Sequence, residues 1–188
     1  DTTAAMDYLQ GVAKVVSEEN KAVSWRTPSG FPIVQEYRKK EHKRAKIFLF
    51  DRALDALKKT TVGSVVETNK TNVQKSMNAI APNFIHGSGD ASHMHLTICR
   101  LLDGKGGIPL AEDFFMVHDS FSISGDTWDL FDTVRDTFVK MYDSGCVLQR
   151  FEDEVRQLLN DPSTELPPIP PKGTLDINGV RYSEFCFS

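Results

Sequence analysis

The stretch 113–123, DFFMVHDSFSI, has the strongest potential for chemistry. Four apolar residues lead directly into His118 and Asp119, and a second short apolar run follows. Short apolar runs flanked by polar residues are typical of strands buried on at least one face. The pattern predicts a hairpin that presents Asp119 at its bend, where the fold would hold a charge rigidly at the surface. Asp is also a common turn residue, because its side chain bonds nearby backbone groups.

A basic stretch is the second candidate. Six cationic residues crowd one segment, opposed there by Glu41 alone: Arg38, Lys39, Lys40, Lys43, Arg44 and Lys46. The net charge of the whole chain is −4, which argues against a generic nucleic-acid binder. A local patch matters more for a phosphate partner than the total charge does. A solvated face is the alternative interpretation of such a charge run.

Composition places the chain among ordinary globular proteins, with 188 residues, 40% hydrophobic and 26% charged. This length suits one domain or a large part of a bigger one. No apolar run approaches the roughly 20 residues that a membrane span needs, so no membrane partner is expected. The first residues lack the pattern of a signal peptide and an initiator Met, which is expected of a processed or trimmed piece. The three cysteines are far apart and form no C-x-x-C pair for zinc or redox work.

The candidate residues need helices to position them. Apolar residues at helical spacing predict five helices, over residues 4–18, 69–81, 91–102, 127–142 and 147–159. Pro82 is expected to end the second helix. A polar, Gly-rich bend is expected over residues 83–90, with Ser88 or Asp90 capping the next helix. The first helix has Ala5, Met6, Leu9, Val12, Ala13 and Val16 on its apolar face. The fourth has Leu130, Phe131, Val134, Phe138 and Met141.

Strands are predicted between the first two helices. Thr27-Pro28-Ser29-Gly30 suits a type I turn, so the residues on either side are expected to form a hairpin. A long projecting loop or ribbon is expected to follow, with a short helical turn at Leu54 and Leu57 and a strand at Val65 and Val66. Near the other end, five prolines between residues 162 and 171 predict a stiff, extended connector.

Several stretches match one family in one order, and together they cover nearly the whole chain. They are WRTPSGFP (25–32) with QEY (35–37), IAPNFIH (80–86), VHDSF (117–121), PPIPPKG (167–173) and the aromatic tail. On these motifs the sequence resembles the carboxyl-terminal part of the single-subunit RNA polymerases of T-odd bacteriophages and their mitochondrial relatives. Ser120 after the Asp is typical of the RNA polymerases, whereas related DNA polymerases usually have Glu there.

The resemblance implies an α+β fold, the carboxyl-terminal part of a right-hand polymerase. Residues 1–86 would form a fingers-side segment with a promoter-specificity loop at about 38–68. Residues 87–188 would form a palm segment with the catalytic hairpin 113–123, helices and the tail.

In this family the hairpin's Asp is one of two that hold two Mg²⁺ ions, so the resemblance assigns a metal ligand to Asp119 and makes His118 a neighbour that shapes the site. His86 and Ser120 would lie near the nucleotide and the template–product duplex. Phe187 and Ser188 would pack back beside the active site, with the terminal carboxylate close to the metals.

The basic stretch lies where the family has its promoter-reading hairpin. Arg44, Lys46 and Arg52 are the candidates for contacts with bases, because Arg is well shaped for two hydrogen bonds to guanine. The candidates for the phosphate backbone are Arg38, Lys39, Lys40 and Lys43.

The chain departs from the family pattern because it lacks the other metal-binding Asp and the nucleotide-gripping helix. It is therefore expected to be inactive alone, as a fragment or a subunit that needs an upstream polypeptide. Its other expected partners are promoter DNA, the template strand, nascent RNA and NTPs, in the cytoplasm of an infected bacterium or, alternatively, in a mitochondrion. Two other functions stay open: a related DNA polymerase, and a non-catalytic module that binds DNA or a partner subunit.

Overall fold

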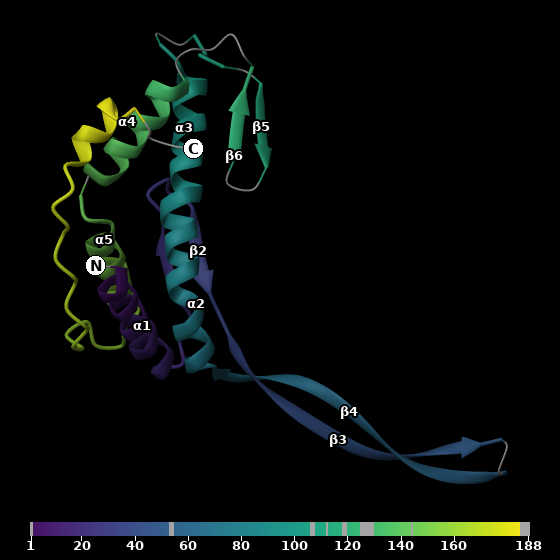
Figure 1. Ribbon diagram of the computed structural model, residues 1–188. Helices are drawn as coiled ribbons and strands as arrows, with labels where there is room; N and C mark the ends of the chain where they lie inside the picture. Colours follow the sequence, from purple (N-terminus) through teal and green to yellow (C-terminus); the bar gives the residue numbers. More distant parts are fainter. Residues whose placement is uncertain are drawn as a thin grey trace.

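The computed structural model describes residues 2–52, 55–105, 108–111, 113–117, 120–124, 130–143 and 145–184. Helices in this part of the chain are combined with three separate two-stranded antiparallel sheets, so the fold is α+β, as predicted (Figure 1). In chain order the elements are α1 (Thr2–Glu18), β1 (Val23–Arg26), β2 (Pro32–Gln35), β3 (Arg38–Asp51), β4 (Ala56–Thr71), α2 (Val73–Ile85), the π-helix η1 (His86–Ala91), α3 (Ser92–Asp103), β5 (Phe114–Val117), β6 (Ser120–Ile123), α4 (Leu130–Asp143), α5 (Val147–Leu158) and the 3-10 helix η2 (Ile177–Tyr182).

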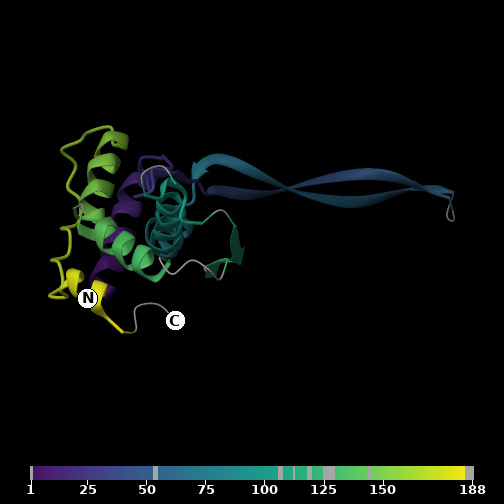
Figure 2. The same cartoon turned by 90° about the horizontal axis from the view of Figure 1, so that it is seen from above.

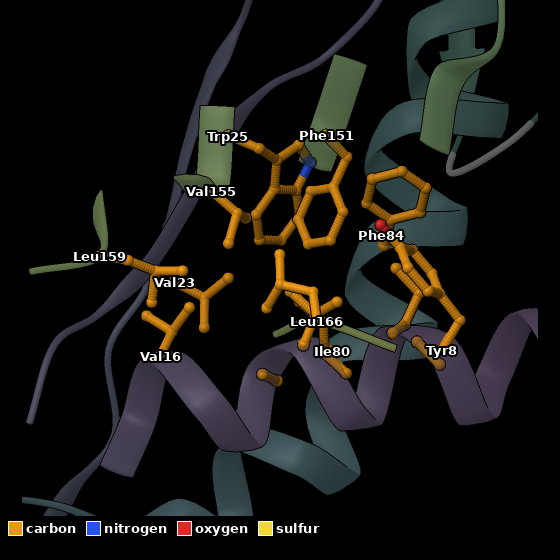
Figure 3. Packing of buried hydrophobic residues seen from close by; sticks show 14 residues of the cluster. Tyr8, Val16, Val23, Trp25, Ile80, Phe84, Phe151, Val155, Leu159 and Leu166 are labelled. Carbon is orange, nitrogen blue, oxygen red and sulfur yellow. The ribbon is translucent and has the colours of Figure 1, made fainter. Parts of the chain in front are cut away.

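The hydrophobic core joins α1, β1, α2 and α5 (Figure 3). The ring centroid of Trp25 lies 5.7 Å from that of Phe84 and 5.8 Å from that of Phe151, and the two phenyl rings are 4.9 Å apart. Tilted and edge-on contacts of this kind add to the free energy gained by burying the rings. Helix α1 buries the predicted face against this cluster, except that Met6 is exposed.

A buried hydrogen bond links α1 to α5. The hydroxyl of Tyr8 donates a hydrogen bond to Glu152 Oε2 at 3.1 Å. Burial, with the adjacent Glu152 carboxylate, raises the pKa of Tyr8 well above its usual value. The hydroxyl therefore stays protonated and remains a donor that holds α1 against α5.

Helices α2, η1 and α3 form one continuous helical run, so the predicted helix end at Pro82 and the predicted bend over 83–90 are wrong (Figure 1). Pro82 lies inside α2, where proline removes one backbone hydrogen bond. The run continues because α2 buries Ile80, Ala81 and Phe84 on one face, which outweighs that loss. Asn72 begins α2, since its side chain accepts a hydrogen bond from the backbone N–H of the third helical residue.

Neither Ser88 nor Asp90 caps α3. Ala91 precedes the helix in an α-helical conformation and makes no side-chain capping bond. A cap is unnecessary there because the π-helical turns of η1 already lead into α3. The predicted boundary between residues 86 and 87 falls inside η1, and the division into fingers and palm segments stays a prediction.

The predicted hairpin around the Thr27 turn is present as β1 and β2. The backbone N–H of Gly30 donates to the oxygen of Thr27 at 2.8 Å. Gly30 has a φ of +84°, a conformation that favours glycine. Pro32 is the first residue of β2, a position that tolerates a missing N–H.

Between β2 and α2 the chain forms a long antiparallel ribbon of β3 and β4, so of the two predicted alternatives it is a ribbon. The predicted helical turn at Leu57 is wrong, because Leu57 pairs with Phe50 in the strands, while Leu54 lies outside the described residues. The ribbon twists and projects away from the helices in both views (Figures 1 and 2).

Helix α4 packs on α3 with a buried face shifted from the predicted one. Phe131 was expected on this face, but 68% of it is exposed. The buried positions include Thr133, Val134 and Thr137. This side of α4 faces α3, where His93 hydrogen-bonds the Val134 carbonyl.

The proline connector after α5 is extended only in part, because Pro162 lies in a turn in which the Thr164 N–H donates to the Asp161 carbonyl at 3.0 Å. From residue 165 to residue 176 it has no helix or strand and is extended, as predicted (Figure 1). Leu166 is buried in the core, and Pro167 lies so close to Gly11 of α1 that a Cβ there would meet its Cγ at 2.5 Å. The connector thus crosses α1 at a residue that must be small. Within the described ranges, no helix has both the length and the apolar character that crossing a membrane requires.

The elements with the candidate site residues lie along the continuous run of α2, η1 and α3. The ribbon lies at the start of this run, and the hairpin of β5 and β6 follows its end. Both views show the ribbon and the hairpin on the same side of the helices (Figures 1 and 2).

Candidate functional site

The predicted hairpin is present as β5 and β6, which pair in antiparallel fashion up to Val117 and Ser120. The two residues between these paired ends, His118 and Asp119, lie outside the described residues. Their roles as metal ligand and neighbour therefore stay predictions. Ser120 is exposed at the start of β6, directly after Asp119 in the chain.

The expectation that this hairpin is buried on at least one face is wrong for the described chain. Phe115 is 75% exposed, and Met116 and Val117 are also exposed. The apolar pattern is that of a covered strand, but β5 and β6 pair only with each other within the described ranges. The face of Phe115 and Val117 is left without the second layer that a sheet needs to bury apolar side chains, while Phe114 and Ile123 on the other face are half-buried.

The π-helix η1 contains His86, whose Nδ1 lies 3.9 Å from Asp90 Oδ2. Both side chains are exposed, so this surface pair contributes little to stability. π-Helical turns are rare and occur frequently at functional sites. The sequence predicts a bend here, whereas the structure has a π-helical turn.

The hairpin of β1 and β2 holds one side of η1. Trp25 Nε1 donates a buried hydrogen bond to Ser88 Oγ at 3.0 Å. A Cβ on Gly87 would lie 2.5 Å from Ile33 Cδ1, so the backbone of η1 packs directly on β2. Within the turn, Ser92 Oγ donates to the Gly87 carbonyl at 2.7 Å. These contacts fix the backbone on both sides of Ser88.

Helix α4 lies near the other side of η1. A Cβ on Gly89 would come within 3.8 Å of the Tyr142 hydroxyl, an ordinary van der Waals distance. Burial, together with the charge of Asp90, raises the pKa of Tyr142. The turn is therefore held by β1 and β2, while His86 projects an exposed imidazole from it. A rigid backbone with an exposed polar ring suits the recognition of a ligand.

The ribbon has two chemically different faces, because paired residues of antiparallel strands project from the same face and neighbours along a strand alternate. We call one of them the basic face: Lys40, His42, Arg44, Lys46, Phe48 and Phe50 of β3, with Glu67, Val65, Gly63, Thr61, Lys59 and Leu57 of β4. We call the other the apolar face: Glu41, Lys43, Ala45, Ile47, Leu49 and Asp51, with Val66, Ser64, Val62, Thr60, Lys58 and Ala56. The basic face has four Lys or Arg residues against one Glu, whereas charges of the two signs balance on the apolar face.

The two main candidates for base contacts share the basic face. Arg44 pairs with Gly63 and Lys46 with Thr61, so both long side chains stand opposite small residues. Each of them has room to reach outward. Arg52, the third candidate, follows β3 and is exposed beyond its last residue.

The residues predicted to bind phosphates do not share one surface: Arg38, Lys39, Lys40 and Lys43. Lys40 Nζ lies 3.4 Å from Glu67, and Arg38 forms an ion pair with Glu36 at the base of the ribbon. Lys39 lies at a register shift, and Lys43 projects from the apolar face. Charge clustering in the sequence did not reveal this division, because alternation along a strand separates neighbouring residues.

The tail residues Phe187 and Ser188 lie outside the described residues. The element before them, η2, is attached to α4, since Arg181 Nη2 lies 3.1 Å from Asp136 Oδ1. Hydrogen bonds from Lys140 and Arg181 hold the pKa of the Asp136 carboxyl below its usual value. The carboxylate thus stays ionised and keeps η2 against α4.

The structure does not gather the predicted site residues into one cluster. His86, Ser120 and Arg44 lie on three different elements, arranged along the continuous helical run (Figure 1). In the part of the chain that the structure describes, no group of three or more His, Cys, Asp or Glu residues could hold a metal ion.

No local sequence pattern indicates the residues that hold η1, and only the glycine at position 87 is an indirect signal. Ser88 and Trp25 are 63 positions apart, and their hydrogen bond is visible only in the folded chain. The short apolar run 47–50 in the sequence likewise gives no sign that Phe48 and Phe50 lie on the basic face.

Comparison with known proteins gives a consistent result. The sequence model of the family described as DNA-dependent RNA polymerase matches residues 1–166. The chain is 37% identical to the DNA-directed RNA polymerase of Enterobacteria phage T3 and 36% identical to T7 RNA polymerase of Escherichia phage T7, in each case over 98% of this chain and 21% of the relative. It is 33% identical to the mitochondrial DNA-directed RNA polymerase 1 of Arabidopsis thaliana, over 98% of this chain and 17% of that protein. The chain therefore spans about a fifth of the length of these relatives.

Proposed function

The chain belongs to the DNA-dependent RNA polymerase family, and we propose that it supplies the carboxyl-terminal part of a DNA-directed RNA polymerase. The reaction is template-directed transfer of nucleotides from NTPs to the 3′ end of an RNA chain. The match of the family over residues 1–166 carries this proposal. The pairing of Val117 with Ser120, on either side of His118 and Asp119, is compatible with a catalytic hairpin.

The proposed cofactor is Mg²⁺, which prefers oxygen ligands and binds through one or two carboxylates plus substrate phosphates. When bound, two such ions stabilise the charge on the attacking and leaving oxygens of the transfer. Asp119 is the proposed ligand in this chain, and His118 is the proposed neighbour that shapes the site. The second carboxylate of the metal site is proposed to come from an upstream polypeptide, on the resemblance to the polymerase family.

Residues of this chain also have proposed roles around the nucleotide. His86 would contact the template–product duplex, supported by the rigid turn that exposes its ring. Ser120, next to Asp119, would lie near the incoming nucleotide. Phe187 and Ser188 would pack beside the active site, with η2 fixed to α4 just before them.

Promoter recognition is assigned to the basic face of the ribbon. The major groove of DNA admits a two-stranded β-ribbon, and Arg can bond both O6 and N7 of a guanine. Arg44 and Lys46 are the proposed readers, because they share a face and stand opposite small residues. Arg52 lies beyond the end of β3 and would contact the DNA farther along.

An upstream polypeptide is the proposed protein partner. The exposed apolar residues Phe115, Met116 and Val117 support it, because exposed apolar patches mark surfaces that another protein covers. Template strand, nascent RNA, promoter duplex and NTPs complete the set of partners. We expect the enzyme to act in the cytoplasm of an infected bacterium, with a mitochondrial location as the alternative.

A ribonucleotide incorporation assay tests the proposal. The chain is mixed with a promoter-bearing template and labelled NTPs or dNTPs, with and without the upstream polypeptide. RNA synthesis only in the combined sample supports the proposal. Incorporation of dNTPs alone would identify a DNA polymerase, and promoter binding without incorporation would identify a non-catalytic module.

A further inference from the structure

The far end of the ribbon has an exposed apolar cluster that promoter reading does not explain. Phe48 is 63% exposed, Phe50 is 59% exposed and Leu57 is 68% exposed. Phe50 pairs directly with Leu57, and all three residues project from the basic face. We call these three residues the tip cluster. Three large apolar side chains at the end of a projecting arm are a costly exposure unless a ligand covers them.

Two lysines adjoin the tip cluster on the same face. Phe48 pairs with Lys59, and Lys46 is the next residue of β3 on this face. Aromatic rings next to cationic side chains suit a polyanion that also offers flat apolar surfaces. Nucleic acid has both, because its phosphates pair with lysines and its bases stack on aromatic rings.

The spacing of the two phenylalanines fits the thickness of a base. The attachment points of residues two positions apart on one face of a strand are separated by roughly 6.8 Å, since each residue rises about 3.4 Å. Bases in a stacked strand are also about 3.4 Å apart. The attachment points of Phe48 and Phe50 are thus separated by about twice the thickness of a base, which leaves space for one base between the rings.

We propose that the tip cluster is a binding site for unpaired bases of single-stranded DNA, with Phe48 and Phe50 as stacking platforms. This inference rests on the part of the proposed function in which the ribbon meets DNA. A phenyl ring has no group that can hydrogen-bond to a base edge, so in an intact major groove its contact with a base is limited to the thymine methyl group. The faces of paired bases are covered by their neighbours in a duplex, whereas unpaired bases offer theirs.

Binding of labelled oligonucleotides to the 188-residue chain tests this inference. The probes are a single-stranded DNA of about 12 nucleotides containing one 2-aminopurine, and the duplex of the same sequence. Fluorescence anisotropy measures affinity, and quenching of 2-aminopurine reports stacking on a ring. Phe48→Ala or Phe50→Ala is expected to weaken binding of the single strand roughly 5- to 150-fold and to abolish the quenching. Phe48→Trp keeps an aromatic face and is expected to retain both.

Leu49→Ala is the matched control, because Leu49 lies between the two phenylalanines in the chain but projects from the apolar face. It is expected to leave the affinity and the quenching unchanged. Equal losses for Leu49→Ala and Phe48→Ala would overturn the inference, as would unquenched 2-aminopurine on the unmodified chain. So would a Phe48→Ala chain that loses affinity only for the duplex.

The two proposals fail separately. If the combined polypeptides make no RNA but the single strand still binds through the two rings, the polymerase proposal fails and the tip site stands. If RNA is made and the Phe→Ala variants bind the single strand normally, the tip site is refuted alone.

Discussion

Trp25 Nε1 donates a hydrogen bond to Ser88 Oγ at 3.0 Å, and both side chains are buried. The bond joins the first hairpin to the π-helix that exposes His86. It is a single contact between two residues 63 positions apart, and it sets where that turn lies on the body of the protein.

Ser88→Ala is expected to lower the free energy of unfolding by about 1–3 kcal/mol, because it leaves the buried indole N–H without an acceptor. Urea denaturation measures the loss. The double variant Trp25→Phe/Ser88→Ala is the control, since it removes both partners and allows a double-mutant cycle. A coupling energy near zero between the two positions would show that the bond is not important.

Gly87→Ala is expected to cost about 1 kcal/mol or more, because its Cβ would meet Ile33 Cδ1 at 2.5 Å. Ile33→Val removes that carbon and is expected to restore part of the loss in the Gly87→Ala background. Thermal denaturation of the four proteins tests the pair. Additive losses would contradict a direct contact.

Protonation of His93 is expected to destabilise the fold. Burial lowers the pKa of this ring below its ordinary value of 6.5, and its Nε2 lies 2.8 Å from the Val134 carbonyl. The folded state therefore favours the neutral ring, so the full stability is present above pH 6.5 and is lost as the pH falls below it. Urea denaturation at pH 7.5 and 5.5 measures the loss, and His93→Gln is expected to reduce it. An equal loss in both proteins would assign it to other groups.

Arg44→Ala is expected to change which promoter bases are preferred, at a cost of about 1–3 kcal/mol for the base that it reads. Lys43→Ala is the matched control, because the neighbouring Lys43 projects from the apolar face. Binding to a panel of promoter duplexes with single-base changes separates the two effects. Uniform losses across the panel for Arg44→Ala would assign it to the phosphate backbone.

Asp119→Asn in the combined polymerase is expected to nearly abolish nucleotide addition while promoter binding is retained. A lost metal ligand removes stabilisation of the charge that develops during the transfer. Rapid-quench measurement of single additions tests it, with Asp113→Asn as the control at the exposed position just before β5, four residues before Val117. A rate above about a tenth of the unmodified one, a loss of only ~1.4 kcal/mol, would exclude metal binding by Asp119.

Helices with one buried face were predictable from the sequence. In α1 and α5 the apolar spacing matches the buried face closely, because each packs against one contiguous core. In α4 the prediction failed at Phe131, since the neighbouring α3 determines which side turns inward. Spacing gives the existence of a helix, but its rotation depends on the contacts it makes.

The π-helix was not predictable from local pattern, and the ribbon was predicted only as one of two alternatives, without its pairing register. Gly87, Ser88 and Gly89 are typical of a bend, and only the contacts with Trp25 and Ile33 favour a helical turn there. The ribbon buries neither face against the core, so no strict alternation of polar and apolar residues reveals its strands. The candidate site depended on motif order, which located Asp119 and Arg44 but gave no information on how η1 is held.

The ribbon contributes no residue to the buried core cluster of the described chain. Substitutions on its outward faces are therefore expected to cost the folded body little stability. Adding residue pairs in both strands would lengthen the arm with its faces preserved, whereas one extra residue in a strand would invert them. Under the proposed promoter role, the DNA contacts of the ribbon could thus change without any change to the residues of the core.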